Sequence, residues 1–239
     1  MALAAVTFLA LFFVPAPYGR FTRAGWGPRL GARWGWVLME LPALATFFVF
    51  YGLGKERTNP VTVMLLFWWA VHYVHRSLIY PFRLRTARPS ITASVIAMGA
   101  CFNIGNGYLN ARYLYTLGPG LPVSWFSDPR FILGALLFWL GFILNRHSDR
   151  ILINLRSPGE TEYRIPTGGG YRFVSCPNYL GEMVEWGGWA LASWNLGGLA
   201  FFLWTFANLT PRAVATHRWY RREFADYPEN RKALIPFVL

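Results

Sequence analysis

Long apolar runs recur along this chain, and they restrict its fold more than any other feature. A helix needs ~20 apolar residues to cross a bilayer, with some tolerance on either side. Seven runs approach that length, and they are residues 2–17, 34–53, 60–81, 90–111, 129–149, 177–193 and 197–213. Only 14% of the residues are charged, about half the usual fraction in a soluble domain. The sequence therefore predicts an all-α fold, a bundle of seven transmembrane helices in a single domain over residues 1–239.

The positions of the basic residues predict how this bundle is oriented. Of the 23 lysines and arginines, Lys55, Arg57, Arg112 and Arg130 lie in the loops after the second and fourth runs, and the other nineteen lie at the ends of the odd-numbered runs. Basic loops are retained in the cytosol, so we expect the amino end outside and the carboxyl end in the cytosol. No basic residue precedes the first apolar run, which favours a span over a secretory signal. The expected location is the bacterial cytoplasmic membrane or the endoplasmic reticulum membrane.

The net charge of +12 then belongs mostly to the cytosolic side. It favours contact with anionic lipid headgroups or an anionic ligand, and no motif that reads a nucleic-acid groove accompanies it. The two cysteines, Cys101 and Cys176, lie in or beside apolar stretches, and we expect both to be packing residues. His72 and His75 lack the spacing of metal-binding motifs. They are expected to form hydrogen bonds between helices, and no metal is expected.

Ionisable residues interrupt the second and third runs. Glu40 lies in "WGWVLMELPAL", and His72, Tyr73, His75 and Arg76 lie within five residues in "VHYVHRSLIY". Such residues cost a few kcal/mol at membrane depth, usually face the bundle interior and mark a functional site. A polar site inside the bundle is therefore predicted.

Helical spacing places further polar residues of the fifth and sixth runs in two stripes. At about 100° per residue, each stripe covers a narrow face of its helix. The first stripe contains Asn145, Asp149 and Arg156, and the second contains Asn178, Glu182 and Glu185. A polar ligand would fit such faces, and so would pairing between neighbouring side chains. For Glu182 and Glu185, a buried ion pair and direct ligand contact both stay open.

A loop with three glycines, residues 168–170, lies between these two runs. No G-x-G-x-x-G opens a helix there, so the soluble dinucleotide-binding fold is excluded. The glycines allow either a flexible turn or a close approach to a ligand. The nearby side chains of Arg156, Tyr163, Arg164 and Arg172 offer bidentate phosphate binding and an aromatic face.

At these residues the sequence resembles the steroid 5-alpha-reductase family of membrane enzymes. The likeness is densest in "RSPGETEYRIPTGGGYRFVSCPNYLGEMVEWGGWALASW" and "FADYPENRKALIPF", and it extends through "HYVHRS" and "MELPAL". The resemblance implies seven transmembrane helices, NADPH as the hydride donor, and reduction of the 4,5 double bond of a 3-oxo-4-ene steroid. The expected partners are this lipophilic enone and membrane lipids, with the protein acting as a monomer.

The resemblance also implies roles for individual residues. Glu40 and Tyr73 match the pair that binds the substrate carbonyl. The positions associated with the dinucleotide, mainly within residues 145–239, are Arg76, Asn145, Asp149, Arg156, Tyr163, Arg164, Asn178, Glu182, Tyr220 and Arg231. Two positions depart from the family pattern: Met39 stands where the steroid enzymes commonly have Gln, and Thr216 replaces one His of the tail motif.

The chemistry of an enone explains the role implied for Glu40 and Tyr73. Hydride adds to the β carbon only if the carbonyl oxygen can take up negative charge, so the site must direct hydrogen-bond donors at that oxygen. Tyr73 offers a phenol proton. Glu40 is a second donor if its carboxyl group stays protonated, as a low-dielectric site favours. Arg76 would anchor the cofactor or compensate charge.

Three other functions fit parts of the pattern. An enoyl thioester or polyprenol reductase of the same superfamily would share the tail and differ in the second and third runs. An isoprenylcysteine-type S-adenosylmethionine methyltransferase also places a cofactor between late helices and a basic, aromatic tail. A seven-helix receptor or transporter is disfavoured, because the polar residues gather toward one side of the membrane.

Overall fold

The computed structural model describes residues 1–14, 17, 19–21, 25–85, 90–157, 159–160 and 162–239. The protein is built from helices, and the predicted all-helical class is confirmed apart from one short β pair. The α-helices are α1 (Ala2–Phe13), α2 (Ala32–Gly52), α3 (Pro60–Val74), α4 (Tyr80–Arg83), α5 (Ala93–Arg112), α6 (Pro129–Asn154), α7 (Pro177–Ser193) and α8 (Leu196–Glu223). Strands β1 (Arg29–Gly31) and β2 (Ser90–Thr92) pair antiparallel.

Each predicted apolar run forms a helix within a few residues of its expected bounds. The third run is α3 and α4 joined by the π-helical segment η2 (His75–Ile79), a distortion that is frequent at functional sites. The helix of the fourth run continues past its predicted end as a π-helical turn, η3 (Tyr113–Leu117). The end of the first run, residues 15–16, and Arg23 lie outside the described residues. By length and hydropathy, α2 and α6 qualify as membrane spans; the seven-span topology and its orientation stay predictions.

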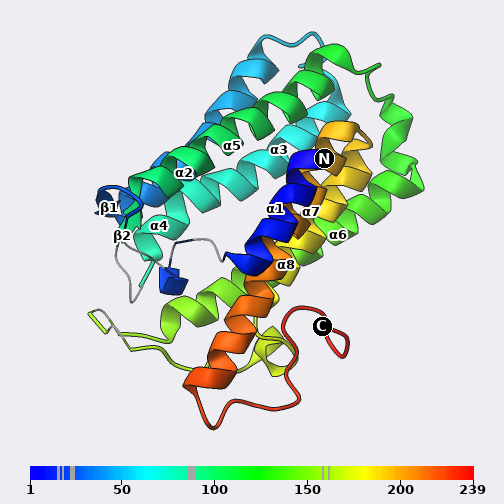
Figure 1. Cartoon of the computed structure of the whole chain (residues 1–239). Helices are drawn as coiled ribbons and strands as arrows, with labels where there is room; N and C mark the ends of the chain where they lie inside the picture. Colours follow the sequence, from blue (N-terminus) through cyan, green and yellow to red (C-terminus); the bar gives the residue numbers. More distant parts are fainter. Residues whose placement is uncertain (15–16, 18, 22–24, 86–89, 158, 161) are drawn as a thin grey trace.

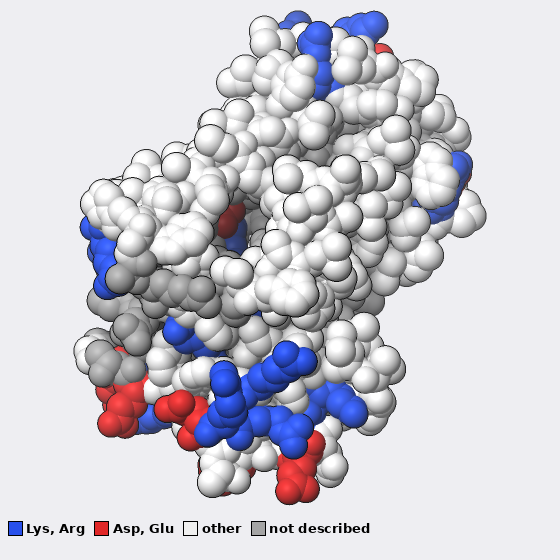
Figure 2. All heavy atoms as spheres, in the orientation of Figure 1, with Lys and Arg blue, Asp and Glu red and all other residues white. Residues whose placement is uncertain are grey.

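The helices form two groups that enclose the site between them. Helix α2 packs on α5, with α3 beside them, and α6 packs on α7, which contacts α8; α1 lies along α8. Helices α6 and α8 extend beyond the others at one end, where the segment between α6 and α7 and the carboxyl-terminal tail also lie (Figure 1). Figure 2 shows basic side chains gathered at this end and a largely uncharged surface above it.

Glycines set the close approach of α6 and α7. A Cβ at Gly141 of α6 would overlap the backbone of Glu185, and one at Gly188 of α7 would overlap the backbone of Phe138. Small residues at such contacts let helix backbones touch, which is the usual device for packing helices in a membrane. This contact fixes the register that brings the two polar stripes face to face.

The apolar core is rich in aromatic rings and fills the end of the bundle away from the basic surface. Trp69, which is fully buried, stacks on Phe47 at 4.4 Å between ring centroids. The packing role predicted for Cys176 is confirmed, because its buried side chain lies in a cluster with Met183. The same prediction for Cys101 was wrong, since this residue is exposed on α5.

Candidate active site

Arg76 lies at the centre of a polar network between the two helix groups. Its guanidinium group lies 3.3 Å from the carboxylate of Asp149 on α6 and 3.8 Å from that of Glu182 on α7. The rings of Trp36 and Tyr80 lie against it, 4.7 and 4.9 Å from the guanidinium carbon. The π-helical segment η2 contains Arg76, and the network holds this partly buried cation between two acids and two aromatic faces.

Two asparagines connect the acids of this network. Asn178 Nδ2 donates to Asp149 at 3.2 Å, and Asn145 Nδ2 donates to the Asn178 carbonyl at 3.0 Å and toward Glu182 at 3.4 Å. The structure thus brings together Asn145, Asp149, Asn178 and Glu182, as the helical spacing predicted. Their assignment to a dinucleotide stays a prediction.

Glu185 belongs to a separate contact. Its carboxylate Oε1 lies 2.7 Å from His72 Nδ1 on α3, and its side chain is fully buried. The prediction that His72 forms an interhelical hydrogen bond is confirmed. Of the two readings left open for the acids, pairing inside the bundle holds for Glu185, while Glu182 lies beside Arg76.

Tyr73 and Glu40 converge on one residue that the sequence analysis missed. The Tyr73 hydroxyl donates to Asn103 Oδ1 at 3.4 Å, and Asn103 Nδ2 donates to Glu40 Oε2 at 3.2 Å. Asn103 comes from α5, Tyr73 from α3 and Glu40 from α2. The missed signal was the presence of three asparagines, Asn103, Asn106 and Asn110, at helical spacing in an apolar run.

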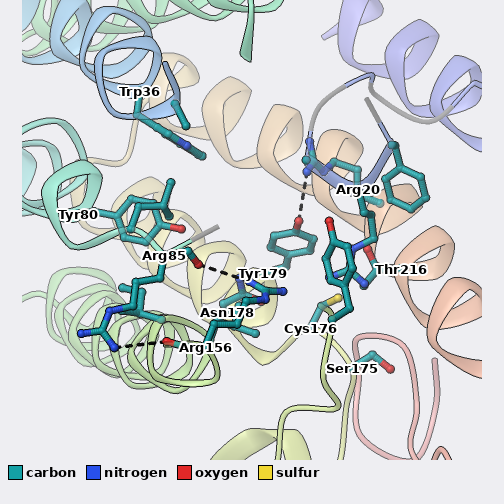
Figure 3. Close-up of a pocket in the computed structure, with 18 of the residues that line it drawn as sticks. Arg20, Trp36, Tyr80, Arg85, Arg156, Ser175, Cys176, Asn178, Tyr179 and Thr216 are labelled. Carbon is teal, nitrogen blue, oxygen red and sulfur yellow. Dashed lines mark hydrogen bonds between the residues drawn. The ribbon is translucent and has the colours of Figure 1, made fainter. Parts of the chain in front are cut away.

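A cavity lies on the basic side of the network. Four arginines, Arg20, Arg85, Arg156 and Arg212, line it, and none of its described lining residues is acidic. Figure 3 shows Arg20 and Thr216 on one side, and Arg85, Arg156, Tyr80 and Trp36 on the other. Because Trp36, Tyr80 and Asn178 also contact the Arg76 network, the cavity and the network form one continuous site. Its charge and aromatic faces suit a polyanion that carries planar rings.

The loop that precedes α7 forms one wall of the cavity. Gly168 has φ +82° and Gly169 φ +48°, and a Cβ at Gly169 would approach His147 within 2.6 Å. The glycines therefore allow a tight turn packed on α6. The turn places the buried Tyr171 in the cavity wall. Pro158 and Thr161 of this loop lie outside the described residues.

The carboxyl-terminal tail packs against Ser175, which lines the cavity just before α7. Ser175 Oγ lies 2.7 Å from His217 Nδ1 and 2.6 Å from the Tyr227 hydroxyl, and the Ser175 amide donates to the Lys232 carbonyl. Burial, together with the surrounding arginines, lowers the pKa of His217, so this imidazole is neutral at pH 7 and can accept from Ser175. The tail is thereby fixed against the start of α7.

The comparisons with known proteins show the family to which this chain belongs. A sequence profile described as 3-oxo-5-alpha-steroid 4-dehydrogenase matches residues 89–239. The chain is 44% identical to 3-oxo-5-alpha-steroid 4-dehydrogenase 1 of Bos taurus, over 100% of this chain and 93% of that protein. It is 41% identical to Steroid 5-alpha-reductase DET2 of Gossypium hirsutum, over 97% and 92%. The chain belongs to the steroid 5-alpha-reductase family. The predicted resemblance is confirmed, and the methyltransferase and receptor readings lose their support.

The other residues predicted to bind the cofactor lie in three different environments in this steroid 5-alpha-reductase family member. Tyr163 and Tyr220 line the cavity with Arg156. Arg164 is exposed and pairs with Glu160 at 3.2 Å. Arg231 is buried, with its guanidinium group 4.9 Å from the centre of the Tyr227 ring.

One geometric expectation needs correction. Helix α6 ends at Asn154, so Arg156 does not continue the stripe of Asn145 and Asp149. Its guanidinium instead donates to the carbonyls of Glu162 and Arg85 from the loop. Arg156 reaches the cavity because the chain turns there.

The two departures from the steroid 5-alpha-reductase pattern also find their places. Thr216 lines the cavity, so a hydroxyl stands in the wall where the family commonly has an imidazole. The Met39 side chain packs tightly on Gly99 of α5, and the Met39 carbonyl accepts from Asn103 at 2.7 Å. Met39 therefore contributes packing and a backbone acceptor.

Proposed function

We propose that this protein is a multi-pass membrane reductase that adds hydride from NADPH to the β carbon of a 3-oxo-4-ene steroid. One observation carries the proposal: a phenol and a carboxyl group converge on Asn103 within an apolar bundle, beside an arginine-lined cavity. Relatives named as steroid reductases and dehydrogenases support the same reaction class. The proposal divides the site into a carbonyl-binding part and a cofactor-binding part.

The outer surface supports a lipid environment. Helices α2 and α6 expose large apolar side chains, among them Trp34, Leu38, Val49, Leu136, Leu140 and Ile143. Exposed apolar area of this extent marks a membrane or an interaction surface. The basic end in Figure 2 would face the cytosol and its anionic lipids. This orientation places the carboxyl-terminal tail in the cytosol.

The cavity fits NADPH by charge and by ring chemistry. Arg20, Arg85, Arg156 and Arg212 would neutralise its phosphates, with no lining carboxylate among the described residues to oppose them. Arginine favours phosphate because its planar donors bind two oxygens at once. When bound, NADPH supplies the hydride. The Arg76 network adjoins the cavity, and Arg76 follows Tyr73 by three residues in the sequence. The network would therefore support the end of NADPH that reacts.

Tyr73 and Glu40 would prepare the substrate. Tyr73 donates its phenol proton to the steroid carbonyl, and Glu40, kept protonated by its apolar surroundings, donates a second hydrogen bond. Both bonds strengthen as negative charge develops on that oxygen, which is the condition for catalysis. Figure 2 shows a hollow in the uncharged face with acidic and basic atoms at its base. A lipophilic substrate could reach the polar site from the bilayer through such an opening.

Cofactor titration tests this function. NADPH at 100 times its Kd should stabilise the purified protein by about 2.7 kcal/mol, and S-adenosylmethionine should not change the thermal midpoint. Arg156→Gln should reduce the NADPH shift. Arg130→Gln, which lies at the opposite end of α6, serves as the matched control and should keep it.

The titration can also contradict the proposal. A rise in midpoint with S-adenosylmethionine alone would assign the cavity to a methyltransferase. A folded protein that responds to neither cofactor would remove the cavity from the proposed reaction.

A further inference from the structure

Three asparagines on one face of α5 form a continuous hydrogen-bonded chain through the bundle. Asn103, Asn106 and Asn110 are all buried, and buried amides are costly unless their donors and acceptors are satisfied. Asn110 Nδ2 donates to Asn106 Oδ1 at 2.9 Å, and Asn106 Nδ2 donates to the Tyr73 hydroxyl at 3.2 Å. Tyr73 donates onward to Asn103. The chain therefore passes through the phenol that the proposed function places on the substrate carbonyl.

The direction of these hydrogen bonds is fixed at the Asn110 end by a group that can only donate. Trp189 Nε1 lies 2.9 Å from Asn110 Oδ1, and an indole N–H has no acceptor role. The Asn110 oxygen must face Trp189, and its nitrogen must face Asn106. The nitrogen also lies 3.1 Å from the Asn106 backbone carbonyl, which can only accept. Both contacts assign the same orientation to the Asn110 amide.

The other end is fixed by a group that can only accept. Asn103 Nδ2 lies 2.7 Å from the Met39 backbone carbonyl. The Asn103 nitrogen must therefore face Met39 and Glu40, which leaves its oxygen toward Tyr73. Amide orientations are normally assigned from their surroundings, and here the indole and the carbonyls leave one consistent choice for the whole chain.

The consequence concerns the Tyr73 proton. Since Asn106 donates to the phenol oxygen, Tyr73 must direct its own proton away from Asn106, toward Asn103. That contact is long, 3.4 Å, so a substrate carbonyl placed beside Asn103 could take the proton in its stead. Donation from Asn106 also polarises the phenol, because bonds in a chain strengthen one another.

Asn103 has a matching effect on Glu40. Its nitrogen donates to Glu40 Oε2, which makes Oε2 an acceptor. A protonated Glu40 then carries its proton on Oε1. Asn103 thus leaves the phenol proton of Tyr73 and the carboxyl proton of Glu40 available to a ligand.

We propose that Asn106 and Asn103 are positioning residues that hold the Tyr73 and Glu40 protons toward the substrate carbonyl. The inference rests on the proposed function for its catalytic meaning. Its structural content, the direction of the Tyr73 hydroxyl, stands on the contacts of the described residues and can be measured separately.

The test reverses the direction of the hydrogen bond between residue 106 and Tyr73 with a side chain of nearly the same shape. Asn106→Asp replaces the donor by a group that, when ionised, only accepts. Tyr73 should then turn its proton toward the new carboxylate, and the substrate carbonyl should lose this donor. We expect kcat to fall on the order of tenfold, a fraction of the about 100-fold effect of removing such a donor outright, with KM for NADPH unchanged. The loss should grow as pH rises, because a protonated Asp can still donate, and the wild-type protein should lack this dependence.

Two further measurements exclude a merely structural role. In a Tyr73→Phe background, Asn106→Asp should cause no additional loss of kcat, because its effect passes through the phenol. Asn195→Asp, at the α8 N-cap where the side-chain oxygen accepts from Gly198, is the matched control and should leave kcat unchanged. An equal loss in both backgrounds would overturn the inference.

The hydroxyl direction has a readout that needs no turnover. The tyrosine Raman doublet ratio differs between phenols that donate and phenols that accept, and subtracting the spectrum of Tyr73→Phe isolates Tyr73. Asn106→Asp should shift this signal toward stronger donation. An unchanged signal would refute the inference, whereas a shifted signal without enone reduction by the wild-type protein would refute the proposed function alone.

Discussion

Tyr73→Phe should lower kcat for a 3-oxo-4-ene steroid by at least about 100-fold, the usual effect of removing one donor from a developing oxyanion. The phenyl ring keeps the buried aromatic packing of Tyr73 on Trp69, so the fold should be retained. The Kd for NADPH should stay within about twofold, because Tyr73 is absent from the cavity lining. Steady-state kinetics and cofactor titration measure the two quantities separately.

Tyr115→Phe is the matched control for this variant. Tyr115 is also fully buried, and its hydroxyl donates to the Thr62 carbonyl at 2.8 Å, away from Asn103. This change should reduce stability slightly and leave kcat unaltered. Glu40→Gln should also slow turnover, and by less than Tyr73→Phe, because an amide retains a donor. Loss of NADPH binding in both Tyr73→Phe and Glu40→Gln would move these residues out of the carbonyl site.

His72→Phe should destabilise the protein by about 1–3 kcal/mol, the usual cost of leaving a buried polar group without its hydrogen-bond partner. It would remove the partner of Oε1 in the fully buried carboxyl group of Glu185, whose Oε2 already has no hydrogen-bond partner among the described residues. Glu185→Leu should be similarly harmful, since it leaves His72 Nδ1 without its acceptor. The double variant should recover part of the loss, because replacing both partners of a buried hydrogen bond by apolar groups can be nearly neutral.

Thermal midpoints in detergent measure this double-mutant cycle. Glu160→Gln is the control, because it breaks the exposed pair with Arg164, and exposed pairs contribute less than about 1 kcal/mol. A coupling of about 1–3 kcal/mol for His72 and Glu185 would support a shared structural role. Additive losses in the double variant would show that the 2.7 Å contact contributes little to the fold.

The acidic residues illustrate how much of the site could be derived from sequence. Helical spacing placed Glu182 and Glu185 on one face, but they meet different partners because they lie ~4.5 Å apart along the axis. His72 on α3 and Arg76 on η2 are four residues apart, ~6 Å along a continuous helix, so antiparallel packing matches Glu185 with His72 and Glu182 with Arg76. Periodicity predicted the face, and only the register set by the α6–α7 contact and the α3 packing decides the pairs.

Other features were harder to predict, each for a physical reason. The asparagines of α5 carry no charge, so a search for ionisable residues in apolar runs passes over Asn103 and Asn106. The β1–β2 pair is three residues long on each side, too short for an alternating pattern to stand out. Arg156 was placed on α6 because spacing gives no sign of where a helix ends. The glycine turn depended on a tertiary contact with His147.

Transfer of deuterium from labelled NADPH tests the central claim most directly. The protein in membranes would be incubated with NADPH that carries deuterium at its transferable position, together with a panel of 3-oxo-4-ene steroids, other lipophilic enones and enoyl thioesters. Mass spectrometry and NMR of the products would locate the label. We expect one deuterium on the β carbon of a steroid product, and at most about one-hundredth as much labelled product from the Tyr73→Phe protein over the same time. A folded wild-type protein that transfers no label to any compound of the panel would contradict the proposed hydride chemistry.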